Sequence, residues 1–142
     1  MAGTDRRGPF WVLLAALTVG AGSSMASTAA EEDTIVINRL GPTEFEVVQG
    51  VNFGAAEFWC GAATYVERRT GQPQTTPIFV KSPRGPSQTV AGRDSVVFST
   101  SAEGLPAADP NRVTLTVDRA GATLKSYQAR RYCRDTFTRS TK

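Results

Sequence analysis

Carboxylates and cysteines are the side chains through which this sequence could carry out chemistry, because its 142 residues include no histidine. Without histidine the chain cannot form a Ser-His-Asp triad, a Cys-His pair, a histidine-ligated metal site or an imidazole pH switch. Glu44 and Glu46 lie two residues apart, so one strand face could present both carboxylates to a glycosidic bond. The alternative places them on the solvent face of an amphipathic strand, with Phe45 and Val47 inside. We adopt this alternative, and the sequence predicts no catalytic residue.

The chain has two cysteines, Cys60 and Cys133, and neither belongs to a CxxC pair typical of redox catalysis. In an exported protein an even number of cysteines indicates disulfides, and two cysteines allow one intramolecular pairing. A Cys60–Cys133 disulfide would leave no thiolate for a zinc ion. The sequence also has no glycine-rich phosphate loop and no EF-hand run of acidic residues. We therefore predict one disulfide, and neither a metal nor a cofactor.

A segment with two prolines, Lys81–Gln88, has the composition of a loop. Lys81 and Arg84 give it positive charge, and Gly85 allows unusual backbone angles. The prolines, Pro86 among them, restrict its conformations. A stiff loop that carries cations loses little conformational entropy on binding, as expected of a recognition loop. The alternative is an ordinary connection between two strands. We keep Lys81, Arg84, Gly85 and Pro86 as candidate recognition residues.

One long α-helix is predicted between Asn52, which can cap its first turn, and Gly71, which can end its last. Between them apolar residues recur at the spacing of one helix face, namely Ala55, Phe58, Trp59, Ala62 and Val66. Phe58 and Trp59 are the expected core anchors, because two aromatic side chains on this face bury a large apolar area. Cys60 lies at the flank of the face, from which it can reach a neighbouring element.

Short runs of β-branched and aromatic residues predict five strands, at 34–38, 44–49, 76–80, 95–99 and 113–117. The last of these runs alternates most regularly. Residues 123–129 are a sixth candidate strand, with a helix through Leu124, Tyr127 and Arg131 as the alternative. This order of elements predicts an α+β domain: an antiparallel sheet of five or six strands with one long helix packed on a face.

Residues 1–30 have the organisation of a secretory signal peptide. Arg6 and Arg7 precede an apolar run at residues 10–19, and small residues follow, so we expect cleavage after one of the residues Ala26 to Ala30. A retained membrane anchor is the alternative, but a span needs roughly 20 apolar residues. The prediction is therefore an exported chain, periplasmic or secreted, with no membrane span after cleavage. Residues 31–135 would form a single domain and residues 136–142 a frayed basic tail.

The function that remains is binding. Beyond residue 30 the chain has 14 basic and 12 acidic residues, a net charge of +2, which is near neutral, whereas a nucleic-acid interface usually needs a clustered basic face. We predict a small exported, disulfide-bonded module that binds a protein or an anionic envelope polymer without catalysis. Two alternatives stay open: an inhibitor of an exported enzyme, and a carboxylate-dependent hydrolase that acts on cell-wall sugar.

Overall fold

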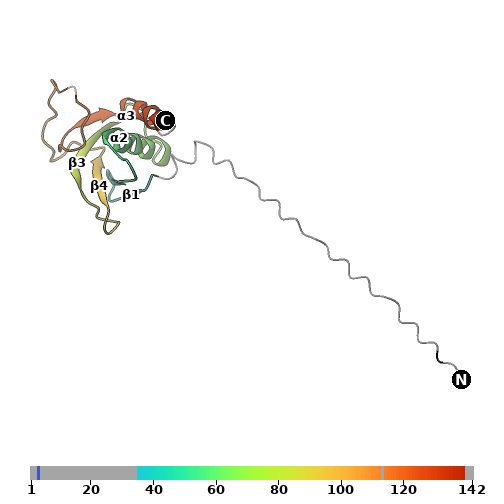
Figure 1. The fold of residues 1–142 in the computed structure, drawn as a ribbon. Helices are drawn as coiled ribbons and strands as arrows, with labels where there is room; N and C mark the ends of the chain where they lie inside the picture. Colours follow the sequence, from blue (N-terminus) through green and yellow to red (C-terminus); the bar gives the residue numbers. More distant parts are fainter. Residues whose placement is uncertain (1–2, 4–34, 113, 140–142) are drawn as a thin grey trace.

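The computed structural model describes Gly3 and residues 35–112 and 114–139 (Figure 1). Apart from Gly3, the predicted signal peptide therefore lies outside the described residues. The helices and strands follow the order β1 (Ile37–Arg39), β2 (Glu44–Val48), α2 (Ala55–Thr64), η1 (Tyr65–Arg69), β3 (Pro77–Pro86), β4 (Asp94–Ser99), β5 (Thr123–Lys125) and α3 (Ser126–Arg139).

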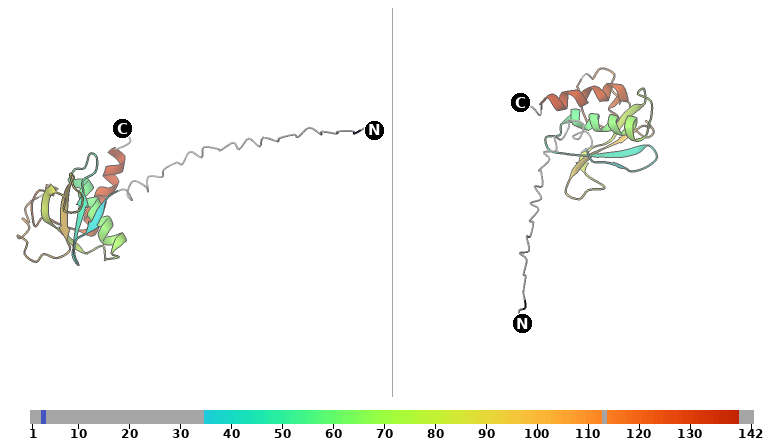
Figure 2. Two further views of the ribbon diagram at one scale, coloured as in Figure 1. Left: turned by 90° about the horizontal axis from the view of Figure 1, so that it is seen from below. Right: turned by 90° about the vertical axis from the view of Figure 1, so that its right-hand side faces the viewer.

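The strands form one five-stranded sheet in the order β1-β2-β4-β3-β5. Every neighbouring pair is antiparallel. Helix α2 lies across one face of the sheet, and α3 packs against α2 (Figure 2). The structure thus confirms the predicted α+β class with an antiparallel sheet, but it has two helices where one was expected.

Helix α2 is shorter than predicted at its start and changes geometry at its end. Asn52 adopts a positive φ of 60° in a turn, and the helix is capped instead at Gly54, whose N–H donates to Glu57 Oε2 at 2.7 Å. After Thr64 the backbone continues as the π-helix η1 rather than as α-helix. The helical segment as a whole spans residues 55–69, and Gly71 follows it with φ 65°, as expected of a helix end.

The sixth predicted strand is mostly helix. Only Thr123–Lys125 pairs with β3, and α3 begins at Ser126, where the N–H of Lys125 donates to Gln128 Oε1 at 2.9 Å. Ser126, Ala129 and Cys133 are buried at helical spacing, so the alternative weighed for this segment is correct from Ser126 onward. The helix continues to Arg139, beyond the predicted domain end at residue 135, while 140–142 lie outside the described residues.

The strand predicted at 113–117 is wrong for its described residues, 114–117, none of which is in a strand. Its alternation reflects one-sided packing: Val117 is fully buried and Leu115 packs against the core. The carbonyl oxygen of Thr116 accepts a hydrogen bond from Trp59 Nε1 at 3.0 Å. The neighbour of β3 on this side of the sheet is β5, which pairs with Pro77–Phe79.

The predicted loop at 81–88 is also corrected, because β3 continues through it as far as Pro86. Its pairing with β4 shifts register between Val80 and Ser82 and again between Ser82 and Gly85. Such bulges release one residue from the ladder, so the missing N–H groups of prolines cost little there. A segment rich in proline and glycine can therefore form part of a strand, because the strand is bulged at this place.

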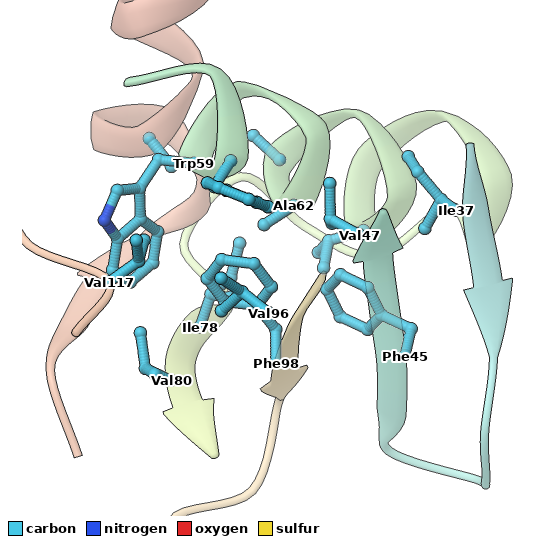
Figure 3. Close-up of a cluster of buried hydrophobic side chains, with 14 residues drawn as sticks. Ile37, Phe45, Val47, Trp59, Ala62, Ile78, Val80, Val96, Phe98 and Val117 are labelled. Atoms are coloured by element: carbon cyan, nitrogen blue, oxygen red, sulfur yellow. The ribbon is translucent and has the colours of Figure 1, made fainter. Parts of the chain in front are cut away.

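The core fills the space between α2 and the sheet (Figure 3). Phe58 and Trp59 have exposed fractions of 0% and 1%, and the Trp59 ring meets Phe98 at 5.1 Å between centroids. Phe45 stacks on Tyr65 at 4.1 Å. These aromatic contacts join the helical segment to strands β2 and β4.

The predicted disulfide is confirmed. Cys60 on α2 and Cys133 on α3 are bonded, with their Cα atoms 4.8 Å apart. Their sequence separation is 73 residues, so the bond closes a long loop that contains most of the sheet. The bond therefore ties α3 to α2. Helix α3 is also connected to the sheet directly, because it follows β5 without a break.

We expect the double variant Cys60→Ala/Cys133→Ala to lose about 4 kcal/mol of unfolding free energy, because the unfolded chain regains the entropy of a 73-residue loop. Urea denaturation followed by far-ultraviolet circular dichroism measures this loss. Reduction of the unmodified chain should shift its midpoint in the same direction. Equal midpoints for the oxidised chain and the double variant would contradict the expectation.

Gly61 is the point at which α2 comes closest to strand β2. A Cβ built at this position would lie 2.9 Å from Val47 Cγ1 and 3.2 Å from Ile35 Cγ2. Glycine is ordinarily unfavourable inside a helix by about 1 kcal/mol relative to alanine. At Gly61 the close approach outweighs that preference, because no larger residue fits without displacing Val47.

The variant Gly61→Ala should therefore destabilise the protein, against helix propensity. Overpacking costs about 1–3 kcal/mol and propensity returns about 1 kcal/mol, so we expect a net loss of roughly 1 kcal/mol in thermal or urea unfolding. In a Val47→Ala background the same substitution should become neutral or stabilising, since the space is then available. A Gly61→Ala chain more stable than the unmodified one would refute this account of the contact.

Candidate functional site

The candidate recognition residues on β3 do not form one surface. The Lys81 ammonium group pairs with Glu44 of β2. Arg84 instead lies over the ring of Phe58 on α2, with Cζ 5.2 Å from the ring centroid, and its Nε lies 3.9 Å from Asp118 Oδ1. Lys81 and Arg84 therefore point to different neighbours, and each has a carboxylate beside it. Gly85 and Pro86 lie at the bulged end of the same strand.

The two glutamates of β2 have different surroundings, and one of them was misjudged from the sequence. Glu44 is partly exposed beside Lys81, but Glu46 is fully buried rather than on a solvent face. Residues 87–89 fold over this side of the sheet and direct three donors at its carboxylate. Ser87 Oγ donates at 2.6 Å, the Gln88 N–H at 2.8 Å, and Thr89 Oγ1 also donates.

A fourth donor, Ser95 Oγ on strand β4, reaches Glu46 Oε2 at 3.0 Å. Burial alone would raise the pKa of Glu46, but the four hydrogen bonds together outweigh burial and lower this pKa from its ordinary value. A general acid requires the opposite shift. Glu46 is therefore a structural carboxylate that holds the connection between β3 and β4 against the sheet.

Glu46→Gln should lower the unfolding free energy at pH 7 by about 1–3 kcal/mol, because an amide cannot accept all four hydrogen bonds. Since the folded-state pKa is lowered, the carboxylate stabilises the fold above its unfolded pKa, and this stabilisation disappears as pH falls through the folded value. The difference between the two chains in urea denaturation should therefore shrink on acidification. Glu44→Gln, at the exposed pair with Lys81, is the control and should cost under about 1 kcal/mol. Equal losses for the two variants would contradict the role given to Glu46.

A pocket of about 380 Å³ lies where the β1–β2 turn meets the end of the helical segment. We call it the arginine pocket. Its polar lining consists of Arg39, Thr43, Arg69, Thr70, Gln72 and Thr100, and its apolar lining of Pro42, Phe45 and Tyr65. Among the residues that the structure describes, two arginines and no carboxylate line this pocket, so this lining carries positive charge.

Among residues 35–112 and 114–133, the partners of both guanidinium groups are backbone carbonyls and not acidic side chains. Arg69 donates from Nη1 to the carbonyl oxygen of Ile37 at 3.0 Å and from Nη2 to that of Ile35 at 3.5 Å. Arg39 donates from Nε to the carbonyl oxygen of Gly41 at 3.0 Å. A carbonyl orients a guanidinium without neutralising it, and each arginine keeps further N–H donors of its five for a ligand. The pocket therefore has the chemistry of a preorganised anion site.

The π-helix positions two residues of this pocket. Tyr65 begins η1 and Arg69 ends it, and both line the pocket. Tyr65 stacks on the buried Phe45, so it forms a rigid wall. Short π-helical segments are often found at functional sites. In η1 the backbone is π-helical, with a wider turn than the α-helix of α2. The two pocket residues therefore lie on a π-helical turn and not on a regular α-helix.

Sequence reasoning missed the arginine pocket. Arg39 and Arg69 are far apart in the chain, and neither belongs to a motif. The one local signal was the Arg68-Arg69-Thr70-Gly71 run at the end of the predicted helix, which is also typical of an ordinary helix end.

Within residues 35–112 and 114–133, whose side chains the structure describes, no group of three acidic or cysteine side chains is arranged to hold a metal ion. In this part of the chain, no helix has the length and apolar character of a membrane span. Comparison with known proteins found no matching family model, no matching curated protein and no matching solved structure.

Proposed function

We propose that this protein is an exported, non-catalytic binding module that holds an acidic sugar of an envelope polymer in the arginine pocket. The observation that carries the proposal is the pair of guanidinium groups, Arg39 and Arg69, that line one cavity and are oriented by backbone carbonyls. Guanidinium groups form strong, often bidentate hydrogen bonds with carboxylates.

The rest of the lining suits a sugar that carries such a carboxylate. The hydroxyls of Thr43 and Thr100 can exchange hydrogen bonds with sugar hydroxyls, and Tyr65 offers an aromatic surface. The Gln72 amide bonds to Thr70 through its nitrogen and can accept from a sugar hydroxyl through its oxygen. Because Tyr65 and both arginines are already positioned, little ordering entropy is lost when a ligand binds.

Export is part of the proposal and is supported by two features. Residues 1–30 have the charge and hydropathy order of a signal peptide. The Cys60–Cys133 disulfide is compatible with an oxidising compartment.

The hydrolase alternative has less support from the geometry. Its two carboxylates would be Glu44, which is paired with Lys81, and Glu46, which accepts four hydrogen bonds and has a lowered pKa. The inhibitor alternative requires that the segment 81–88, predicted as a proline-braced loop, insert into the target enzyme, but most of this segment is strand β3.

Calorimetric titration with an oligogalacturonate tests the proposal, with a neutral maltooligosaccharide of equal length as the second probe. We expect measurable affinity for the acidic oligosaccharide only. Arg39→Gln should weaken it roughly tenfold or more, since a hydrogen bond to a charged group contributes about 1.5–3 kcal/mol.

Lys125→Gln is the matched control, because it removes one positive charge outside the pocket and should leave the affinity unchanged. The proposal is wrong if neither oligosaccharide binds, if the neutral one binds equally well, or if Lys125→Gln weakens binding as much as Arg39→Gln.

A further inference from the structure

A second cavity, of about 360 Å³, lies beside strand β5, where the segment that follows β4 passes over α2 and α3. We call it the loop cleft. The residues that matter for its chemistry are Trp59, Asp109, Leu115, Arg119, Leu124 and Tyr132. None of the residues that line it also lines the arginine pocket, so the two cavities are separate.

The floor of the loop cleft is apolar. Trp59 is 1% exposed, and its indole N–H is already donated to the Thr116 carbonyl oxygen, so it contributes ring carbon to the floor. Figure 3 shows its ring beside Val117, at the opposite end of the core from Ile37. Leu115 and Leu124 are partly buried and pack against the same core. An apolar group that entered the cleft would therefore extend the core surface.

Arg119 places a positive charge at the rim of the loop cleft. Arg119 is exposed, and among the described residues its guanidinium group has neither an ion pair nor a hydrogen bond. Asp109 is the acidic residue of the lining, and it already lies 4.0 Å from Arg112 Nε. A ligand with a negative group at Arg119 would thus meet a cation without a partner.

One wall of the cleft is set by a close backbone contact. Gly121 has φ 84°, and a Cβ at this position would lie 2.2 Å from the carbonyl oxygen of Pro106. The Gly121 N–H also donates to the carbonyl oxygen of Val80 on β3 at 2.8 Å. These contacts fix the wall to the sheet, so this side of the cleft is formed before a ligand arrives.

From these features we infer that the loop cleft binds a small amphiphilic carboxylate, such as a medium-chain fatty acid. The apolar tail lies on Trp59, Leu115 and Leu124, and the carboxylate pairs with Arg119. The cavity volume is within the range of roughly 300–1,000 Å³ found for small-molecule sites. This site is independent of the sugar site proposed above.

Trp59 makes the inference directly measurable. The chain has two tryptophans, Trp11 and Trp59, so in the full-length Trp11→Phe chain all tryptophan fluorescence comes from the floor of the cleft. Titration of this chain with octanoate should change the emission saturably. Octanol, which lacks the charge, should bind at least tenfold more weakly, and acetate, which lacks the tail, should cause no change.

Arg119→Gln in the same background should weaken octanoate binding about tenfold while octanol binding stays the same. Arg93→Gln is the charge-matched control, because Arg93 does not line the cleft and its guanidinium group donates to the carbonyl oxygen of Gln49 instead, and it should leave octanoate affinity unchanged. The inference is overturned if octanoate gives no saturable change, if octanol binds as tightly as octanoate, or if Arg119→Gln binds octanoate normally.

Discussion

The short distance between α2 and the sheet is the constraint on which the rest of the molecule depends. Gly61 has no side chain, so α2 can approach β2 until its backbone meets Val47. At this distance the side chains of Phe58 and Trp59 are buried in the core, and Cys60 on the neighbouring flank of α2 forms the disulfide with Cys133 of α3. The same placement directs the end of the helical segment toward the first hairpin of the sheet, where η1 lines the arginine pocket. The packing of the core, the position of the disulfide and the position of the proposed binding site therefore all depend on the absence of a side chain at Gly61.

Features that depend on local pattern could be predicted from the sequence, and features that depend on distant partners could not. Strands β2 and β4, the amphipathic face of α2 and the single cysteine pairing follow from periodicity and counting. Helix α3 was only an alternative because the residues it buries, Ser126 and Ala129 among them, are small and give a weak hydropathy signal. Glu46 was misplaced because its donors are 41–49 residues away, and alternation along one strand cannot reveal what covers its second face.

The same distinction explains why the sequence drew attention to Lys81 and Arg84 and not to Arg39 and Arg69. Lys81 and Arg84 attracted attention through the composition of one short segment, but the fold places Glu44 and Asp118 beside them. Arg39 and Arg69 have no distinctive neighbours in sequence, yet the described part of the chain places no carboxylate in the lining of their pocket. Whether a surface cation can bind an anion depends on the counter-ions around it, and their positions are a property of the tertiary structure.

The two hydrogen bonds from Arg69 also have a consequence for the solubility of the protein. Strand β1 forms one edge of the sheet, and the carbonyl groups of Ile35 and Ile37 point away from β2. They are the acceptors with which a strand from another molecule would pair if the sheet were to continue across two chains. Because the Arg69 guanidinium already occupies both carbonyls, such pairing would first have to displace a charged side chain. One arginine thus serves as a wall of the pocket and as a barrier to edge-to-edge aggregation.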